Sequence, residues 1–173
     1  NIGTDGYIDR ASVDLNSYYL QGGYFAENTS VKLIAFAGKE KTYHAWGYAT
    51  KKEMEDFGRR YNPCGEMYTD ANGNKHFYDD QTDNYLQKNY QLLFNHTFST
   101  AWNLNVALHY TKGDGYYEEY KDGRSLIEYG LKPFTIDGTE ITKSDLVRQK
   151  KMDNKFGGGV FSLNYTVNRL NAS

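Results

Sequence analysis

Apolar and polar residues alternate most clearly over residues 83–117. On either side of a short turn at 99–101, most even positions from Leu86 to Tyr110 are apolar or aromatic, with Lys88 and His96 as exceptions, and most odd positions carry amides or hydroxyls. This period of two is typical of β-strands with two different faces. A three-residue loop is an allowed hairpin connection, and it sets Phe94 opposite Val106 and Leu92 opposite Leu108. A slip by one residue would mix the faces, so the pattern also predicts the register.

The same alternation continues near the end of the chain, over residues 154–168. Phe161, Leu163 and Tyr165 share one face of this segment, and serine, asparagine and threonine fill the other. We therefore expect a further strand here.

An earlier hairpin is predicted over residues 11–43, with its turn at 26–29. Its first strand is less regular, because the apolar phase changes between Leu15 and Tyr18. A β-bulge near Asn16 would explain this change, since one extra residue reverses the face of every later side chain.

The connections alternate in length, with short turns at one end of the predicted strands and long loops, 44–82 and 118–152, at the other. In the first loop, Thr50 followed by Glu53 has the spacing of a capping box and predicts a helix over 51–60. A turn is expected at 70–74.

The second loop, 118–152, is predicted to contain a turn at Asp137-Gly138 and a short helix over 144–150. Together these elements predict an all-β protein. We expect an antiparallel meander of about five long strands, with long loops carrying short helices, over residues 1–173.

The asymmetry of the connections is typical of outer-membrane barrels, which have short turns on one side and long loops on the other. The segment from Tyr90 to Phe98 matches the roughly 9–11 residues of a membrane strand, and aromatic residues bracket its apolar positions. We therefore interpret the chain as a fragment of a transmembrane β-barrel. The side chains expected to contact the lipid bilayer are Leu92, Phe94, Phe98, Trp102, Leu104, Val106, Leu108 and Tyr110.

Composition narrows this interpretation. The mean hydropathy is low, −0.80, but 17 tyrosines are present, and disordered chains are poor in aromatic residues. A net charge of −2 without a basic stripe argues against a nucleic-acid partner. The single cysteine, Cys64, excludes an intrachain disulfide. No apolar run approaches the length of a transmembrane helix.

Motifs for chemistry are weak. We find no nucleophile elbow, phosphate-binding loop or zinc motif, and expect neither enzymatic activity nor a cofactor. Asp70, Asn72 and Asn74 have the spacing of the first ligands of a calcium loop, but Gly73 stands at the wrong position. We therefore expect no metal site there.

Several short segments, in order, resemble the early barrel strands and loops of TonB-dependent outer-membrane receptors. They are Gly6–Ala11, Gly38–Trp46, Arg60–Pro63, Thr82–Tyr85, and Trp102–Asn105 running on to Gly115–Glu118. The resemblance covers roughly residues 5–168.

This resemblance implies a barrel of about 22 strands, closed by a plug domain and energised through TonB. Such a receptor imports an iron complex, cobalamin or a glycan across the outer membrane of a Gram-negative bacterium, with its long loops extracellular. We recognise no plug domain, TonB box or signal peptide in the chain, so we expect these partners elsewhere in a full-length protein. About five strands cannot close such a barrel, and their unpaired edges predict self-association.

Ligand contacts in such a receptor are expected from aromatic residues in the long loops and upper lumen. The candidates are Tyr43, His44, Trp46, Tyr116, Tyr117 and Tyr120. A second interpretation is that these side chains pack their own loops down.

An alternative to the receptor is a soluble β-sandwich that binds carbohydrate or acts in adhesion. The feature that separates the two is what covers the apolar face of the central hairpin, because a sandwich needs a second sheet there.

Overall fold

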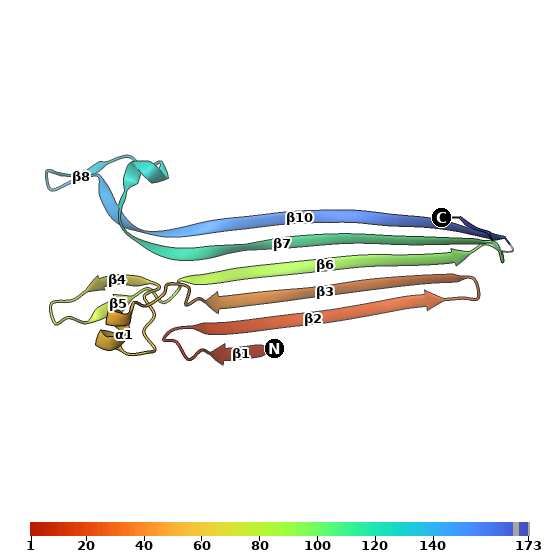
Figure 1. Cartoon of the computed structure of the whole chain (residues 1–173). Coiled ribbons are helices and arrows are strands. Elements are labelled where there is room, and N and C mark those ends of the chain that lie inside the picture. The colour runs from red at the N-terminus through yellow and green to blue at the C-terminus, as the bar shows by residue number, and fades with distance from the viewer. Residues whose placement is uncertain (168–169, 173) are drawn as a thin grey trace.

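The computed structural model, which describes residues 1–167 and 170–172, is dominated by one long antiparallel sheet (Figure 1). Each strand pairs with the next one in the sheet along the chain, which makes the sheet a meander, and the expected all-β class is confirmed. In order, its strands are β1 (Ile2–Asp5), β2 (Ser12–Phe25), β3 (Thr29–Tyr43), β6 (Thr82–Thr97), β7 (Trp102–Ser125), β10 (Lys143–Val167) and β11 (Leu170–Ala172).

The remaining elements gather at one end of the long strands, which we call the loop end; the opposite end, with its tight turns, is the turn end (Figure 1). They are helix α1 (Lys51–Phe57), the hairpin of β4 (Glu66–Thr69) and β5 (Lys75–Phe77), the 3-10 helix η1 (Leu126–Tyr129), and the hairpin of β8 (Phe134–Ile136) and β9 (Thr139–Ile141). None of the helices in the described part of the chain is long and apolar enough to cross a membrane.

The predicted register of the central hairpin is confirmed. Leu92 pairs with Leu108 and Phe94 with Val106, and the N–H of Phe98 donates to the carbonyl of Trp102 at 3.0 Å to close the turn. The two faces of β6 and β7 are therefore those that the alternation predicts.

Residues in register place apolar side chains from five strands on one face of the sheet, which we call the apolar belt. Its principal members are Leu20, Tyr24, Val31, Leu33, Tyr90, Leu92, Phe94, Leu104, Val106, Leu108, Tyr110, Phe161 and Leu163. The other face, called the polar face, carries most of the amides and hydroxyls of β6 and β7, together with apolar residues such as Ile34, Leu93 and Val160.

The sheet is a single layer, so the belt has no protein cover in the described residues. The accessible surface is 12377 Å², whereas a folded monomer of this mass exposes about 8,700 Å². Leu33 is 59% exposed and Phe161 70%. Among residues 1–166, the buried hydrophobic ones are Ala37, Tyr43, Tyr61, Cys64, Tyr117 and Leu126. The second sheet that a sandwich requires is not found in residues 1–167 and 170–172.

The bulge expected in the first hairpin is wrong. The pairing of β2 with β3 runs without a shift from Ser12 opposite Tyr43 to Phe25 opposite Ser30. The two apolar phases belong instead to two faces of one regular strand. Tyr18 and later even residues join the belt, while Leu15 lies on the polar face, toward the loop end.

The extent of the second loop is also corrected. Residues 118–125 continue β7, and 143–152 form the first part of β10, so the helix expected over 144–150 is a strand. These residues form strands because charged side chains pair across them, as Glu119 on β7 does with Arg148 on β10. The pairing of β10 with β7 shifts its register between Ser144 and Leu146. On the facing part of β7, Gly123 accommodates the shift by adopting a left-handed conformation with φ of 53°.

Other local predictions hold. Thr50 and Glu53 form the capping box that starts α1, which ends at Phe57 rather than at residue 60. The turn at 70–74 joins β4 to β5. Asp137 and Gly138, with φ of 48° and 78°, join β8 to β9. Residue 168 of the predicted last strand lies outside the described residues.

Candidate functional site

A pocket of about 380 Å³ opens at the loop end on the polar face, and we call it the loop-end pocket. Alternate positions of β7 supply one wall, β10 supplies Lys150, and the segments after β3 and α1 close the other side. The lining residues are Trp46, Gly47, Pro63, Cys64, Gln81, Tyr117, Glu119, Lys121 and Lys150.

Aromatic rings form one side of this pocket. The rings of His44 and Trp46 stack at 4.7 Å with an interplanar angle of 12°, and Trp46 meets the edge of Tyr117 at 4.7 Å and 67°. Trp46 is half exposed, whereas Tyr117 is buried. The rings therefore offer a rigid apolar surface with one open face.

The other side of the pocket is charged. The carboxylate of Glu119 accepts from Lys121 Nζ at 2.8 Å, Arg148 Nε at 2.9 Å and Lys150 Nζ at 3.2 Å. Burial opposes ionisation of Glu119, but these hydrogen bonds outweigh it and lower the pKa to about 2. Three cations share the Glu119 carboxylate, and a second carboxylate, that of Asp83, lies 3.8 Å from His44 on the side of the rings. With His44 neutral, these three cations and two carboxylates leave one positive charge.

Tyr117 stays neutral in this setting. Burial raises the pKa of its hydroxyl, and the nearby charge of Glu119 raises it further. The ammonium of Lys150 lies 5.9 Å from the centre of the Tyr117 ring, close enough for a cation–π contact. A flat ligand with negative charge fits this combination of rings and cations best.

A group of buried and half-buried residues with mutual hydrogen bonds holds the pocket walls together, and we call it the anchoring cluster: Arg10, Tyr43, Asn62 and Cys64. Asn62 is fully buried. Its amide donates to the carbonyls of Asp9 at 3.0 Å and His44 at 3.4 Å, and its Oδ1 accepts from the N–H of Cys64 at 3.0 Å. One side chain thus joins three segments that are distant in sequence.

Arg10 and Tyr43 complete the anchoring cluster. Arg10, in the left-handed region at φ 63°, donates to the carbonyl of Asn62 and stacks over the ring of Phe77 at 3.5 Å. The hydroxyl of Tyr43 lies 3.0 Å from the carbonyl of Cys64. Three of the segments that resemble receptor sequences, 6–11, 38–46 and 60–63, therefore meet at one point.

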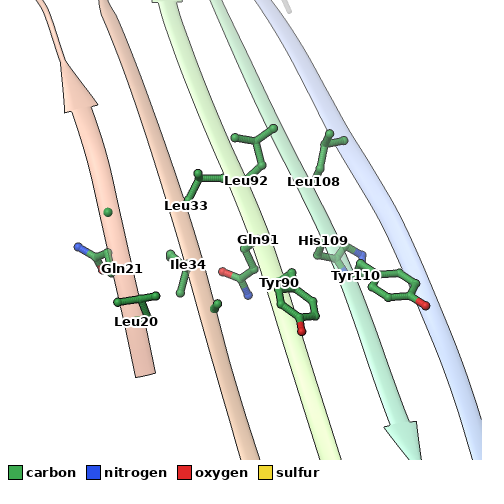
Figure 2. Close-up of a pocket in the computed structure, with 12 residues that line it drawn as sticks. Leu20, Gln21, Leu33, Ile34, Tyr90, Gln91, Leu92, Leu108, His109 and Tyr110 are labelled. Carbon is green, nitrogen blue, oxygen red and sulfur yellow. The ribbon is translucent and has the colours of Figure 1, made fainter. Parts of the chain in front are cut away.

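A second hollow, of about 620 Å³, lies on the apolar belt (Figure 2). Figure 2 shows Tyr90 and Tyr110 toward one end of it and Leu33, Leu92 and Leu108 toward the other. Its surface is almost entirely hydrocarbon, so it suits alkyl chains rather than a polar ligand.

No family model, curated protein or solved structure matches the chain. The resemblance to TonB-dependent receptors therefore rests on the residues alone.

The six candidate residues divide into two groups. His44, Trp46 and Tyr117 come together at the loop-end pocket, and Tyr43 is buried beneath it in the anchoring cluster. Tyr116 and Tyr120 lie on the opposite face of β7, because neighbouring positions of a strand alternate in direction.

Tyr120 has a structural partner on that face. Its hydroxyl donates to Asp145 Oδ2 at 2.6 Å, and this contact raises its pKa to about 12. The structure thus separates Tyr116 and Tyr120 from the pocket.

Charged pocket residues are absent from the sequence-based candidates. Glu119 and Lys121 alternate on β7, as Arg148 and Lys150 do on β10. Charged residues at every second position of these two polar segments could have indicated a charged strand face at the site. The segments were interpreted as loops, in which such spacing has no structural meaning.

Asp70 acts in turn formation. Its Oδ1 accepts from the N–H groups of Asn72 at 2.9 Å and Asn74 at 2.8 Å, and these bonds, with one from the Asn74 side chain, lower its pKa to about 2. In the described part of the chain, no group of three acidic, histidine or cysteine residues is placed to hold a metal ion.

Proposed function

We propose that this chain forms part of the wall of an outer-membrane transporter of the TonB-dependent receptor kind, which imports a scarce ligand such as an iron complex, cobalamin or a glycan. The observation that carries the proposal is the exposed apolar belt on a single-layer sheet whose central strands are polar on the other face. In water such a belt is costly, whereas in a bilayer lipid covers it.

The dimensions of the belt support the proposal. From Lys88, at the loop-end border of the belt, to Phe98, directly after the end of β6, the chain advances roughly 33 Å at about 3.3 Å per residue. At a tilt of about 40° this corresponds to a height of roughly 25 Å, which is the height of the apolar band of outer-membrane barrels.

Aromatic residues border the belt at both ends. Tyr90 and Tyr110 pair near the loop end, and Trp102 contacts Tyr165 at 4.5 Å near the turn end. Tyr and Trp favour the interface between lipid and water because their rings are apolar and their tips are polar.

The polar face suits a lumen. Asn95 donates to Asn105 at 2.5 Å, Asn105 to Asn103 at 2.7 Å, and Thr111 to Asn89 at 2.8 Å. These bonds satisfy polar side chains within the face. At its loop end the same face leads to the loop-end pocket, where an anionic, flat ligand would first bind.

Within the part of the chain that the structure describes, β1 and β11 form the two edges of the sheet and pair with no further strand. An open edge inside a bilayer leaves backbone groups without partners. We therefore propose that further strands or a second copy of the chain pair with these edges. Adhesion by a soluble sandwich is less favoured, because it leaves the belt exposed to water.

Spin labels on adjacent residues of β7 test the proposal. Single cysteines at Val106, Ala107, Leu108 and His109, in a Cys64→Ser background, would be labelled and reconstituted into lipid vesicles. Labels at 106 and 108 should meet oxygen dissolved in the lipid, and labels at 107 and 109 a water-soluble nickel chelate. Equal accessibility of all four positions to the nickel chelate would overturn the proposal.

A further inference from the structure

Three lysines stand side by side at the loop-end border of the apolar belt. Lys88 on β6 pairs directly with Lys112 on β7, and Lys112 pairs directly with Lys155 on β10. All three side chains share the face of the belt, because each lies two residues from a belt position or its register equivalent. We call them the lysine row.

Such a row is electrostatically unfavourable on its own. Like charges at directly opposed positions of a sheet repel, with their Cβ atoms about 5 Å apart. Within residues 1–167 and 170–172, none of the three ammonium groups forms an ion pair. The carboxylates of Asp114 and Asp153 lie one row further toward the loop end. The row therefore separates these acidic groups from the belt.

The position of the row matches a lipid headgroup. On the side toward the belt, the next residues of β6 and β7 on the same face are Tyr90 and Tyr110, which line the apolar hollow of about 620 Å³ (Figure 2). A lysine stem lies along apolar surface while its ammonium reaches the polar border. The row thus places positive charge where headgroups meet acyl chains, directly beside a hollow suited to those chains.

We propose that the lysine row binds the phosphate groups of lipids in the outer leaflet, with their acyl chains lying in the hollow of the belt. This proposal rests on the proposed function, which embeds the belt in a bilayer with the loop end outward. Lysine is a common phosphate ligand and acts there as a compact charge. Bound phosphates would also relieve the repulsion within the row.

The test uses vesicles of phosphatidylcholine alone, with lipid A, or with dephosphorylated lipid A. We expect tighter binding to vesicles with lipid A than to the other two. Replacing Lys88, Lys112 and Lys155 by Gln should remove this preference. Each lysine near an anionic surface contributes up to about fivefold to the affinity, and this factor is lost with each replacement. Inorganic phosphate in solution should compete only weakly, because the acyl chains contribute to binding.

A matched control replaces Lys51, Lys132 and Lys143 by Gln, which removes the same charge at the loop end, away from the row. This variant should keep the preference for lipid A. Equal loss in both variants, or a preference that survives in the row variant, would overturn the proposal. If the chain binds all three kinds of vesicle equally, the proposal for the lysine row fails and the proposed function stands. If it binds none, the proposed function fails, and the lysine proposal with it.

Discussion

Asn62 connects the loop segments that form the loop-end pocket. Its side chain has no exposed surface and bonds to backbone groups of Asp9, His44 and Cys64. Any replacement that cannot donate and accept in these positions leaves buried backbone groups without partners, which costs about 1–3 kcal/mol. Cys64, the sole cysteine, is buried next to it and can report the opening of the cluster.

We predict that Asn62→Ala increases the rate at which Cys64 reacts with a thiol reagent by about 5-fold to 150-fold, because the rate follows the population of the opened state. The measurement is the labelling rate of the native chain in the absence of denaturant. Asn72→Ala, in the exposed turn between β4 and β5, serves as control and should leave the rate unchanged. A rate unaltered by Asn62→Ala would remove the anchoring role from this residue.

Glu119 is the second residue whose environment leads to a prediction. Its three cationic partners lower the pKa from the usual 4.5 to about 2 against the opposing effect of burial. The ionised carboxylate therefore stabilises the folded chain above about pH 4.5. This contribution disappears as the pH falls toward about 2, where the carboxyl is protonated.

Glu119→Gln should thus reduce the free energy of unfolding at pH 7 by about 2–3 kcal/mol, and the difference from the native chain should vanish near pH 2. The measurement is denaturant unfolding across this pH range. The exposed Glu55, replaced by Gln in the same way, should give a pH dependence parallel to that of the native chain. A constant difference between Glu119→Gln and the native chain at all pH values would contradict the ion cluster.

At the scale of elements, β6 presents a lipid face and a polar face at successive residues. Leu92 lies near the middle of the belt, whereas Gln91 lies on the polar face. In vesicles, Leu92→Lys should lower the free energy of unfolding by about 2–4 kcal/mol, the cost of a lysine at the bilayer midplane. Gln91→Lys should change it by less than about 0.5 kcal/mol. Similar effects at both positions, measured by urea unfolding, would show that the face of Leu92 is not in lipid.

The central hairpin could be predicted from sequence because its two faces differ in polarity, so that one register fits. The loop-end halves of β7 and β10 could not, because charged and polar residues occupy both of their faces. In these halves, ion pairs between the strands, such as that of Glu119 with Arg148, stabilise the sheet. A pattern of hydrophobic residues does not reveal such pairs. The change of apolar phase in β2 indicated a bulge, but it marks the border of the belt on a regular strand.

The candidate site was predicted only in part, for a related reason. Aromatic residues in loops suggested ligand contacts, and His44, Trp46 and Tyr117 do meet. Which face of β7 a tyrosine occupies depends on whether the segment is a strand. With residues 118–152 interpreted as a loop, the sequence gave no face for Tyr120, although Tyr116 and Tyr117 already stood at alternating positions of the predicted hairpin.

At the scale of the whole molecule, the sheet has almost no core of its own. Many large hydrophobic residues of the belt, such as Leu20, Leu33 and Phe161, are exposed, and the few buried hydrophobic residues lie mainly near the loop end. The hydrogen-bonded meander fixes the strands relative to one another, but burial of the belt must come from outside the described chain. We propose that lipid supplies this burial.

The two tryptophans allow the most direct test of that claim. Trp102 borders the belt near the turn end, and Trp46 lies in the loop-end pocket. In vesicles whose lipids carry bromine on their acyl chains, the fluorescence of Trp102, measured in a Trp46→Phe variant, should be strongly quenched. The fluorescence of Trp46, measured in a Trp102→Phe variant, should be little changed. Equal quenching of the two, or none at Trp102, would contradict the account.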